Sequence, residues 1–424
     1  MQTVCFKTLG CKVNQYETQA IREQLNSNGF IETKGAADIY IINTCTVTER
    51  SDSESKEIIR KVLRENPSSF VLVTGCYTEK NTDELSRING IGAIVPNAKK
   101  PNIPSILFGS DIETSDIFTF SISDFAGHTK AFVKIQDGCN RFCSFCKVPL
   151  VRSRSRSRPL RDIVEEVKRL VNRGFKEVVM TGICLGDYGR DFKNGTDLVK
   201  LIDELEKIEL KFRVRLSSID PEDITDELIN RLATAKKLCR HLHIPLQSGD
   251  DDILKRMDRH YVSSEFIILI NKIKQMIQDI AITLDVMVGF PGESEVNFNN
   301  TLNVVNEIAP LRMHIFPYSK REGTKAARFN GVVPAHIVRK RIKRLREFQA
   351  EMSYNFRRGY IGKQLKVLVE TKRDRTTGFL TGYSDNYIKI VFEGPNELMR
   401  KLICVEILDV THNFTYGRKN GYSE

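Results

Sequence analysis

The chain has 424 residues, of which 41% are hydrophobic and 28% charged, a composition that excludes a largely disordered protein and allows about three domains. Its formal charge of +11 favours an anionic partner, with RNA or DNA ahead of a membrane. We find neither a run of about 18 apolar residues nor a secretory signal, so we expect a cytoplasmic protein that does not contact membranes. Ten cysteines in such a protein indicate metal or redox chemistry rather than disulfides.

The first part of the chain alternates short apolar runs with helical patterns. Strands are expected at 3–9, 38–44 and 70–75, and helices at 15–28, 48–64 and about 82–88. Apolar runs of this length separated by helices are typical of βαβ units. We therefore predict a parallel-sheet α/β domain over residues 1–125, ending in a connector that has weak periodicity.

A second alternating series predicts a larger domain over residues 126–358. Six strands are expected at 131–136, 177–182, 212–218, 241–247, 282–289 and 311–318, with helices between them such as 160–172 and 222–232. Asp220, before a proline, is a plausible N-cap for the second of these helices. Six βα units in a row favour a (βα)6 partial, TIM-like barrel. A basic helix over about 334–358 closes the series, and the β-rich residues 359–424 predict a small β-barrel.

Three cysteines follow the first strand of the predicted partial barrel. Cys139, Cys143 and Cys146 form a C-x3-C-x2-C array, so one short loop can aim three thiolates at one point. Three ligands suit an iron–sulfur cubane that has one iron open to a substrate. A closed zinc site would need a fourth ligand, but the nearest histidines are His128 and His241. A non-catalytic iron–sulfur or zinc protein that binds RNA stays an alternative.

This array, with Phe145 before its last cysteine, resembles the signature of the radical S-adenosylmethionine (SAM) enzymes. The resemblance implies a partial barrel and a [4Fe–4S] cluster whose open iron binds SAM, from which a 5′-deoxyadenosyl radical is made. It also places the cofactor contacts at successive strand ends, although the Gly-Gly-Glu sequence common after the second strand is absent. The candidate cofactor-binding residues are Phe145, Gly182, Gly186, Arg215, Ser217, Gln247 and Gly289.

A second set of cysteines is scattered along the N-terminal domain. Cys11, Cys45 and Cys76 each follow a predicted strand, and the carboxyl ends of parallel strands share one edge of a sheet. The three thiols can therefore converge, although three ordinary buried cysteines would give the same spacing. Cys5 lies inside its strand and is interpreted as a core residue. Cys184 is interpreted as a packing residue, with a thiol that acts near the cofactor as the alternative.

The sequences TLGCKVNQYET, INTCTVT and TGCYTEK around this second set resemble the N-terminal domain of the radical SAM methylthiotransferases. The resemblance extends over essentially the whole chain and implies a second [4Fe–4S] cluster, also with three cysteine ligands and one open iron, which carries the transferred sulfur. GYSDNYIKIVFEG resembles a TRAM domain, an RNA-binding β-barrel. All six cysteines are then catalytic metal ligands.

Within this family, CKVNQYE, VPLVRSRSRSRP and MHIFPYSKREGTKAA resemble the MtaB type. That type adds a methylthio group to carbon 2 of N6-threonylcarbamoyladenosine, next to the anticodon of tRNA. The implied partners are the tRNA anticodon stem-loop, SAM, an electron donor such as flavodoxin or ferredoxin, and a sulfur donor. Two relatives compete: the type that modifies N6-isopentenyladenosine in tRNA, and the type that modifies an aspartate of a ribosomal protein.

The positive charge is concentrated in two segments. Residues 147–173 hold nine Lys/Arg against three Asp/Glu, and residues 331–360 hold eight against two. These segments predict an electrostatic footprint for phosphate. The β-rich end is nearly balanced, so we expect it to bind RNA by shape and by stacking on residues such as Tyr383 and Tyr387.

Overall fold

A computed structural model describes residues 2–109 and 116–419. The first layer is a parallel sheet in the order β2-β1-β3-β4-β5. Its strands are β1 (Thr3–Thr8), β2 (Ile31–Glu32), β3 (Ile39–Thr44), β4 (Phe70–Gly75) and β5 (Ile91–Val95). The central strand β3 is buried along its whole length, as expected for an apolar run covered on both faces. The three predicted strands are present, and β2 and β5 are additional.

Helices α1 (Lys12–Ser27), α2 (Glu49–Glu65), α3 (Thr78–Ser86) and α4 (Ile103–Phe108) connect and cover this sheet. Helix α1 begins three residues before the predicted start, so that Cys11 is its N-cap. The described part of the predicted connector contains α4, and Phe120, Ile122 and Phe125 are buried in the main core. Residues 110–115 of the connector lie outside the described residues.

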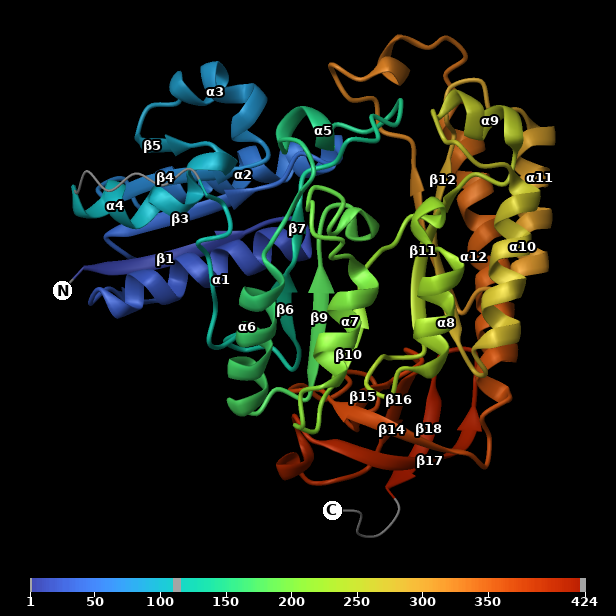
Figure 1. Ribbon diagram of the computed structural model, residues 1–424. Helices are drawn as coiled ribbons and strands as arrows, with labels where there is room; N and C mark the ends of the chain where they lie inside the picture. Colours follow the sequence, from blue (N-terminus) through green and yellow to red (C-terminus); the bar gives the residue numbers. More distant parts are fainter. Residues whose placement is uncertain (1, 110–115, 420–424) are drawn as a thin grey trace.

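The central part is the predicted open barrel of six parallel strands (Figure 1). Its strands form two sheets, β10-β9-β6 and β11-β12-β13, joined through bridges such as Ser218 to His243. Among the described residues β6 and β13 do not pair, so the barrel is not closed. The strands are β6 (Ala131–Lys134), β9 (Glu177–Thr181), β10 (Arg213–Leu216), β11 (His241–Gln247), β12 (Ala281–Val288) and β13 (Arg312–Pro317).

Helices on the outer face bury the apolar side of these strands. They are α6 (Leu160–Asn172), α7 (Leu198–Glu206), α8 (Asp226–Thr234), α10 (Ser263–Met276), α11 (Glu295–Ile308) and α12 (Ala335–Arg358). The short helix α9 (Asp251–Arg256) follows β11 and lies above the carboxyl ends of the strands in Figure 1. Asp220 caps a short 3-10 helix (Pro221–Asp223), whereas the N-cap of α8 is Thr225, so the predicted helix at 222–232 is split in two. The loop after β6 contains β7 (Gln136–Asp137), α5 (Val148–Val151) and β8 (Arg156–Ser157).

The C-terminal part is a closed barrel in the order β14-β15-β16-β18-β17, which agrees with the predicted TRAM-like fold. Its strands are β14 (Gln364–Val369), β15 (Leu380–Ser384), β16 (Lys389–Phe392), β17 (Leu402–Val410) and β18 (Thr415–Lys419), around their own apolar core. Figure 1 shows this barrel below the amino ends of β9 and β10, opposite the loops at the carboxyl ends. In the described chain, every helix is too short or too polar to span a bilayer.

Candidate functional site

The thiols of the N-terminal part meet at one edge of the sheet, as the sequence predicted. Cys11, Cys45 and Cys76 follow β1, β3 and β4, which are adjacent strands. Burial raises the pKa of Cys45, and the neighbouring Cys76 and Cys11 raise it further, because a thiolate there would face two others. Gly10 has φ +91, and a Cβ on it would lie 2.8 Å from the sulfur of Cys45, so only glycine fits there.

The side chain of Asn14 holds two of these cysteine loops together. Its Nδ2 donates to the carbonyl of Leu9 at 2.9 Å and to that of Thr44 at 3.0 Å. The two carbonyls lie just before the loops of Cys11 and Cys45. Asn14 is fully buried, and the carbonyl of Thr44 also accepts from the amide of Cys76 at 3.1 Å, so the loops of all three cysteines are linked here. We call Cys11, Cys45 and Cys76 the sheet-edge trio.

The second trio, the loop trio of Cys139, Cys143 and Cys146, lies between β7 and α5. Ser144 anchors the loop, because its amide donates to the carbonyl of Met257 at 3.0 Å and its hydroxyl to that of Arg256 at 2.7 Å. Burial raises the pKa of Cys146 to about 12, with further contributions from Cys143 and Cys139. Phe145 packs with Ile253, Met257, Met287 and Phe290 under the loop.

Cys184 lies beside the loop trio, so of its two interpretations packing alone is incomplete. A hydrogen bond between its thiol and Cys139 lowers the pKa of Cys139 to about 7. The sulfur of Cys184 also lies 3.4 Å from Nε of Arg141 and 3.7 Å from Oδ2 of Asp223. On the other side of the loop, Arg259 lies 3.4 Å from the sulfur of Cys143. No local sequence pattern marks these contacts, since their residues come from separate loops.

Both trios are too wide for a single zinc ion. Zinc–sulfur bonds of ~2.3 Å place the sulfurs of a tetrahedral site about 3.8 Å apart. Among the described residues, neither trio has its three sulfur atoms within 4.8 Å of one another. A cubane cluster spaces its thiolate ligands more widely because each binds a different iron atom. Three thiolates in each trio are donors of the kind that an iron–sulfur cluster takes.

Two of the predicted cofactor contacts offer free polar atoms at strand ends. The hydroxyl of Ser217, after β10, and Oε1 of Gln247, at the end of β11, are buried and have no hydrogen-bond partner. Gln247 also has φ +62, a conformation rare for a side chain of this kind. Unpaired buried polar atoms and backbone strain both concentrate at ligand sites. These two residues suit a polar ligand such as SAM.

The predictions for the other contacts need correction. A Cβ on Gly182 would meet Gln136 at 2.9 Å, one on Gly186 would meet Asp223 at 2.1 Å, and one on Gly289 would meet Val338 of α12 at 2.5 Å. These glycines therefore make room for protein side chains. The side chain of Arg215 points toward the C-terminal barrel, where it donates to Glu177 at 2.8 Å and to the carbonyl of Asp385 at 2.9 Å. It joins the two barrels instead of lining the mouth.

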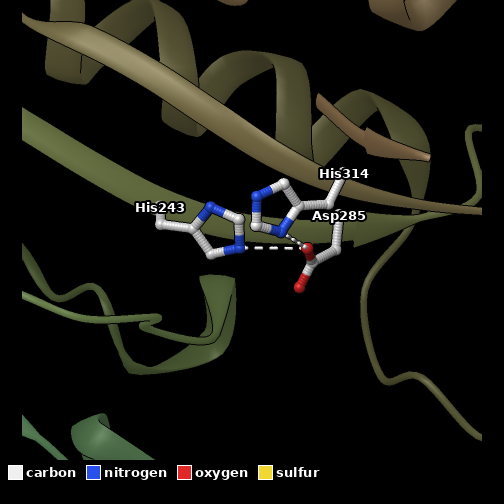
Figure 2. Close-up of side chains that lie close together, drawn as sticks. All are labelled: His243, Asp285 and His314. Atoms are coloured by element: carbon white, nitrogen blue, oxygen red, sulfur yellow. Dashed lines mark ion pairs between the residues drawn. The ribbon is translucent and has the colours of Figure 1, made fainter. Parts of the chain in front are cut away.

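A polar cluster lies on the inner face of the partial barrel, where Figure 2 shows His243, Asp285 and His314 on three neighbouring strands. Oδ1 of Asp285 lies 3.1 Å from Nε2 of His243 and 3.4 Å from Nδ1 of His314. Burial raises the pKa of Asp285, but the two imidazoles outweigh it and hold the pKa well below its ordinary value. Two histidines and a carboxylate this close have the composition of a metal site.

Hydrogen bonds behind His243 favour a proton on Nε2, which opposes metal binding there. The hydroxyl of Thr283 lies 2.9 Å from Nε2 of His241 and 2.9 Å from Nδ1 of His243. Nδ1 of His241 is buried without a partner, and an orphaned N–H is rarer than an orphaned acceptor. We therefore assign the proton of His241 to Nε2, so that Thr283 donates to His243 and His243 donates to Asp285.

Part of the positive charge predicted to meet phosphate is used inside the protein. Arg152, Arg158, Arg341 and Arg357 are buried. The exposed basic residues of α12 include Arg339, Lys340, Lys343 and Arg346.

The aromatic rings expected to stack on RNA also pack inside the protein. Tyr387 stacks on His241 of the partial barrel with 4.5 Å between ring centroids, and Tyr383 stacks on Tyr387. Lys130 lies over Tyr383 at 4.4 Å. Both tyrosines are only partly exposed, so they serve the contact between the two barrels.

Comparison with known proteins agrees with this geometry. Residues 133–305 match the Radical SAM superfamily, and residues 3–95 match the uncharacterized protein family UPF0004. The chain is 37% identical to the threonylcarbamoyladenosine tRNA methylthiotransferase MtaB of Bacillus subtilis, over 99% of this chain and 96% of the relative. It is 37% identical to MtaB of Thermotoga maritima, over 93% and 92%. It is 34% identical to the tRNA-2-methylthio-N(6)-dimethylallyladenosine synthase of Fusobacterium nucleatum, over 98% and 99%.

Among solved structures, the radical SAM methyltransferase TsrM of Kitasatospora setae has a similar fold, with a TM-score of 0.55, 13% identity, and 74% and 73% of the two chains covered. The SAM radical enzyme OxsB gives a TM-score of 0.51 over 83% of this chain and 56% of its own. These likenesses concern the fold alone. Together with the full-length relatives and the two thiol trios, they lead to one conclusion: the chain belongs to the radical SAM tRNA methylthiotransferase family, whose members use SAM and a [4Fe–4S] cluster.

Proposed function

We propose that this enzyme adds a methylthio group to carbon 2 of N6-threonylcarbamoyladenosine at position 37, in the tRNA anticodon stem-loop. The observation that carries the proposal is the 37% identity to MtaB over 99% of the chain. Relatives named for the dimethylallyl substrate are similar over the same length, at 33–34% identity, so that nucleoside is the second candidate. A single-stranded loop suits either reaction, because a base there can leave its stack to enter a barrel.

The loop trio is proposed to hold the [4Fe–4S] cluster that binds SAM, and the sheet-edge trio a second [4Fe–4S] cluster that carries sulfur. The assignment is supported by the three cysteine thiols of each trio, one set on a single loop and the other after three adjacent strands. The chemistry supplied when the first cluster is bound is the one-electron cleavage of SAM to methionine and a 5′-deoxyadenosyl radical. An external electron donor such as flavodoxin or ferredoxin and a sulfur donor complete the proposal.

The protein's own residues bind and orient the reactants. Ser217 offers its hydroxyl and Gln247 its amide oxygen to the polar groups of SAM. Neither of these two atoms has a hydrogen-bond partner among the described residues. Phe145 fills the apolar space beneath the cysteine loop and keeps it in place. The three proposed domains (1–125, 126–358 and 359–424) divide the tasks into sulfur transfer, radical formation and RNA binding. The exposed arginine and lysine side chains of α12 contact the phosphates of tRNA.

Mass spectrometry of tRNA nucleosides from a strain that lacks the gene tests the substrate. We expect the methylthio form of threonylcarbamoyladenosine to disappear and to return with the wild-type gene. Loss of the methylthio-isopentenyl nucleoside instead would assign the second candidate. The clusters are tested separately by anaerobic reconstitution, which should give about eight irons per chain, four for each cluster. A chain that binds about four irons would contradict the second cluster.

A further inference from the structure

A compact group of charged side chains lies between the two trios, where all five members are at most 5% exposed. Arg152 donates to Oε1 of Glu17 at 2.7 Å and lies 3.0 Å from Oδ2 of Asp137. Lys134 lies 2.8 Å from Glu17 and 2.6 Å from Asp137, and Lys100 lies 2.5 Å from Glu17. We call these residues the buried charge group. They come from α1, the 3-10 helix at Asn97–Asn102, β6, β7 and the residue after α5.

The charges of this group do not cancel. Three cations face two carboxylates, which leaves one positive charge in a region closed to water. Burying an uncompensated charge is costly, so its persistence calls for an anion nearby. The geometry identifies that anion: Nε of Arg152 lies 3.3 Å from the sulfur of Cys76, a member of the sheet-edge trio. A thiolate that binds iron carries the missing negative charge.

The same guanidinium also reaches the other trio through the backbone. Asp137, its carboxylate partner, lies two residues before Cys139 and accepts a hydrogen bond from the amide of Gly138 at 2.8 Å. A Cβ on Gly138 would lie 2.2 Å from the carbonyl of Arg154, so the chain is tightly held at this point. Arg152 therefore lies on a short path of contacts from Cys76 to the start of the loop trio.

We propose that Arg152 is a positioning residue that tunes the sheet-edge cluster: its guanidinium and the excess charge of the buried charge group stabilise the more negative, reduced state of that cluster. The proposal rests on the second cluster of the proposed function. Reduction adds an electron to the cluster, so a fixed positive charge beside a ligand favours it, as does an N–H donor to the ligand sulfur. Arg152 would thus raise the cluster's reduction potential and fix its orientation toward the loop trio.

The charge of this group predicts that substitutions of Arg152 and Asp137 shift the reduction potential in opposite directions. Arg152→Gln removes the excess positive charge and should lower the reduction potential, whereas Asp137→Asn raises the charge from +1 to +2 and should increase it. Arg152→Lys keeps the charge and should stay near the wild type. A residue with a merely structural role would not give shifts of opposite direction. Arg158→Gln is the matched control, because Arg158 is equally buried but donates to Glu166 and Tyr16 and contacts no cysteine.

Each variant is made in a full-length chain with Cys139, Cys143 and Cys146 replaced by alanine, so that the sheet-edge trio holds the one remaining cluster. Iron is quantified after anaerobic reconstitution, and the potential is measured by redox titration followed by electron paramagnetic resonance. We expect the reduction equilibrium to change at least tenfold, or 59 mV for a one-electron couple, in opposite directions for Arg152→Gln and Asp137→Asn. For Arg158→Gln the reduction equilibrium should change less than threefold.

The outcomes separate this inference from the function it rests on. If the parent chain with three alanines binds no iron, the second cluster is wrong and the inference falls with it. If the parent binds about four irons but Arg152→Gln and Asp137→Asn leave the potential unchanged, or shift it in the same direction, only the role of Arg152 is wrong. If Arg152→Gln alone fails to bind iron, the proposal is decided by the other two variants: the potential should rise for Asp137→Asn and stay near the wild type for Arg152→Lys, and any other result overturns it.

Discussion

Glu177 and Arg213 form an ion pair at the amino ends of β9 and β10, with 2.6 Å between Oε2 and the guanidinium. Arg213 also donates to the carbonyls of Lys366 and Tyr383 in the C-terminal barrel, at 3.1 and 2.8 Å. One carboxylate therefore orients an arginine that joins the two barrels. Glu177 is completely buried, so its carboxylate depends on the arginines for charge compensation.

Replacing Glu177 by glutamine should lower the free energy of unfolding by about 3–5 kcal/mol at pH 7, because it leaves the buried Arg213 and Arg215 without their counter-charge. Burial raises the pKa of Glu177, but Arg215 and Arg213 outweigh it and hold the pKa well below the ordinary 4.5. The unfolded state is therefore protonated first as pH falls. In urea unfolding, the difference in free energy of unfolding between the variant and the wild type should stay constant down to about pH 4.5 and become smaller below it.

Variants of the two trios should abolish different steps of the reaction. Cys143→Ala should abolish the formation of 5′-deoxyadenosine, since the cluster that binds SAM would lack a ligand. Cys45→Ala should retain SAM cleavage while losing methylthiolation. Chromatography of the nucleoside products, with iron quantified in each variant, checks both. Methylthiolated product from Cys45→Ala would refute the role of the sheet-edge trio, and Cys5→Ala, a core cysteine outside both trios, is the matched control.

Ser217→Ala should separate ligand binding from stability. Its hydroxyl has no partner in the protein, so the free energy of unfolding should change by less than about 0.5 kcal/mol. Loss of one hydrogen bond to SAM should weaken binding about fivefold, equivalent to about 1 kcal/mol. Equilibrium binding of SAM to the reconstituted protein and thermal unfolding of the same sample measure the two effects. Equal SAM affinity in both proteins would remove Ser217 from the binding site.

Thr283→Val tests the chain of hydrogen bonds inside the barrel. The change leaves one nitrogen of His241 and one of His243 without a partner, so unfolding should become easier by about 1–3 kcal/mol. Thr381→Val is the matched control, since the hydroxyl of Thr381 is buried without any partner and its loss should cost nothing. Similar stabilities of the two variants in urea would contradict the two hydrogen bonds of Thr283 to the histidines.

The exposed arginine and lysine side chains of α12 should govern the salt dependence of tRNA binding. Replacing Arg339, Lys340 and Lys343 together by glutamine should weaken binding, and the slope of log K against log salt should fall by about 1 for each residue that meets a phosphate. The same change at three exposed lysines elsewhere, Lys193, Lys207 and Lys211, should leave the slope unaltered. Filter binding at several salt concentrations distinguishes the two sets.

Much of this architecture follows from patterns along the chain. Regular spacing of apolar runs predicted the six strands of the partial barrel, and the position of each cysteine after a strand predicted that Cys11, Cys45 and Cys76 meet. The short strand β5, IGAIV, was missed because it is brief and contains a glycine. The C-terminal barrel was expected from the dense alternation of β-forming runs and turn residues.

Side-chain direction was beyond reach of the same patterns. Arg215 and Ser217 lie two residues apart near one strand end, yet the long arginine side chain turns to the far barrel, while the short serine stays at its position. Arg152 was counted only as part of a basic segment, because its partners Glu17 and Asp137 come from distant segments. Which charges are buried is decided by tertiary packing, and no local rule records it.

The placement of the six cysteines has a consequence for how the enzyme matures. The loop trio spans eight residues, from Cys139 to Cys146, so a nascent chain presents all three thiols to an iron carrier as soon as that loop emerges. The sheet-edge trio spans 66 residues and has no common location until β1, β3 and β4 have paired. The second cluster that we propose would therefore enter a domain that has already folded, at a later stage of biosynthesis than the cluster of the loop trio.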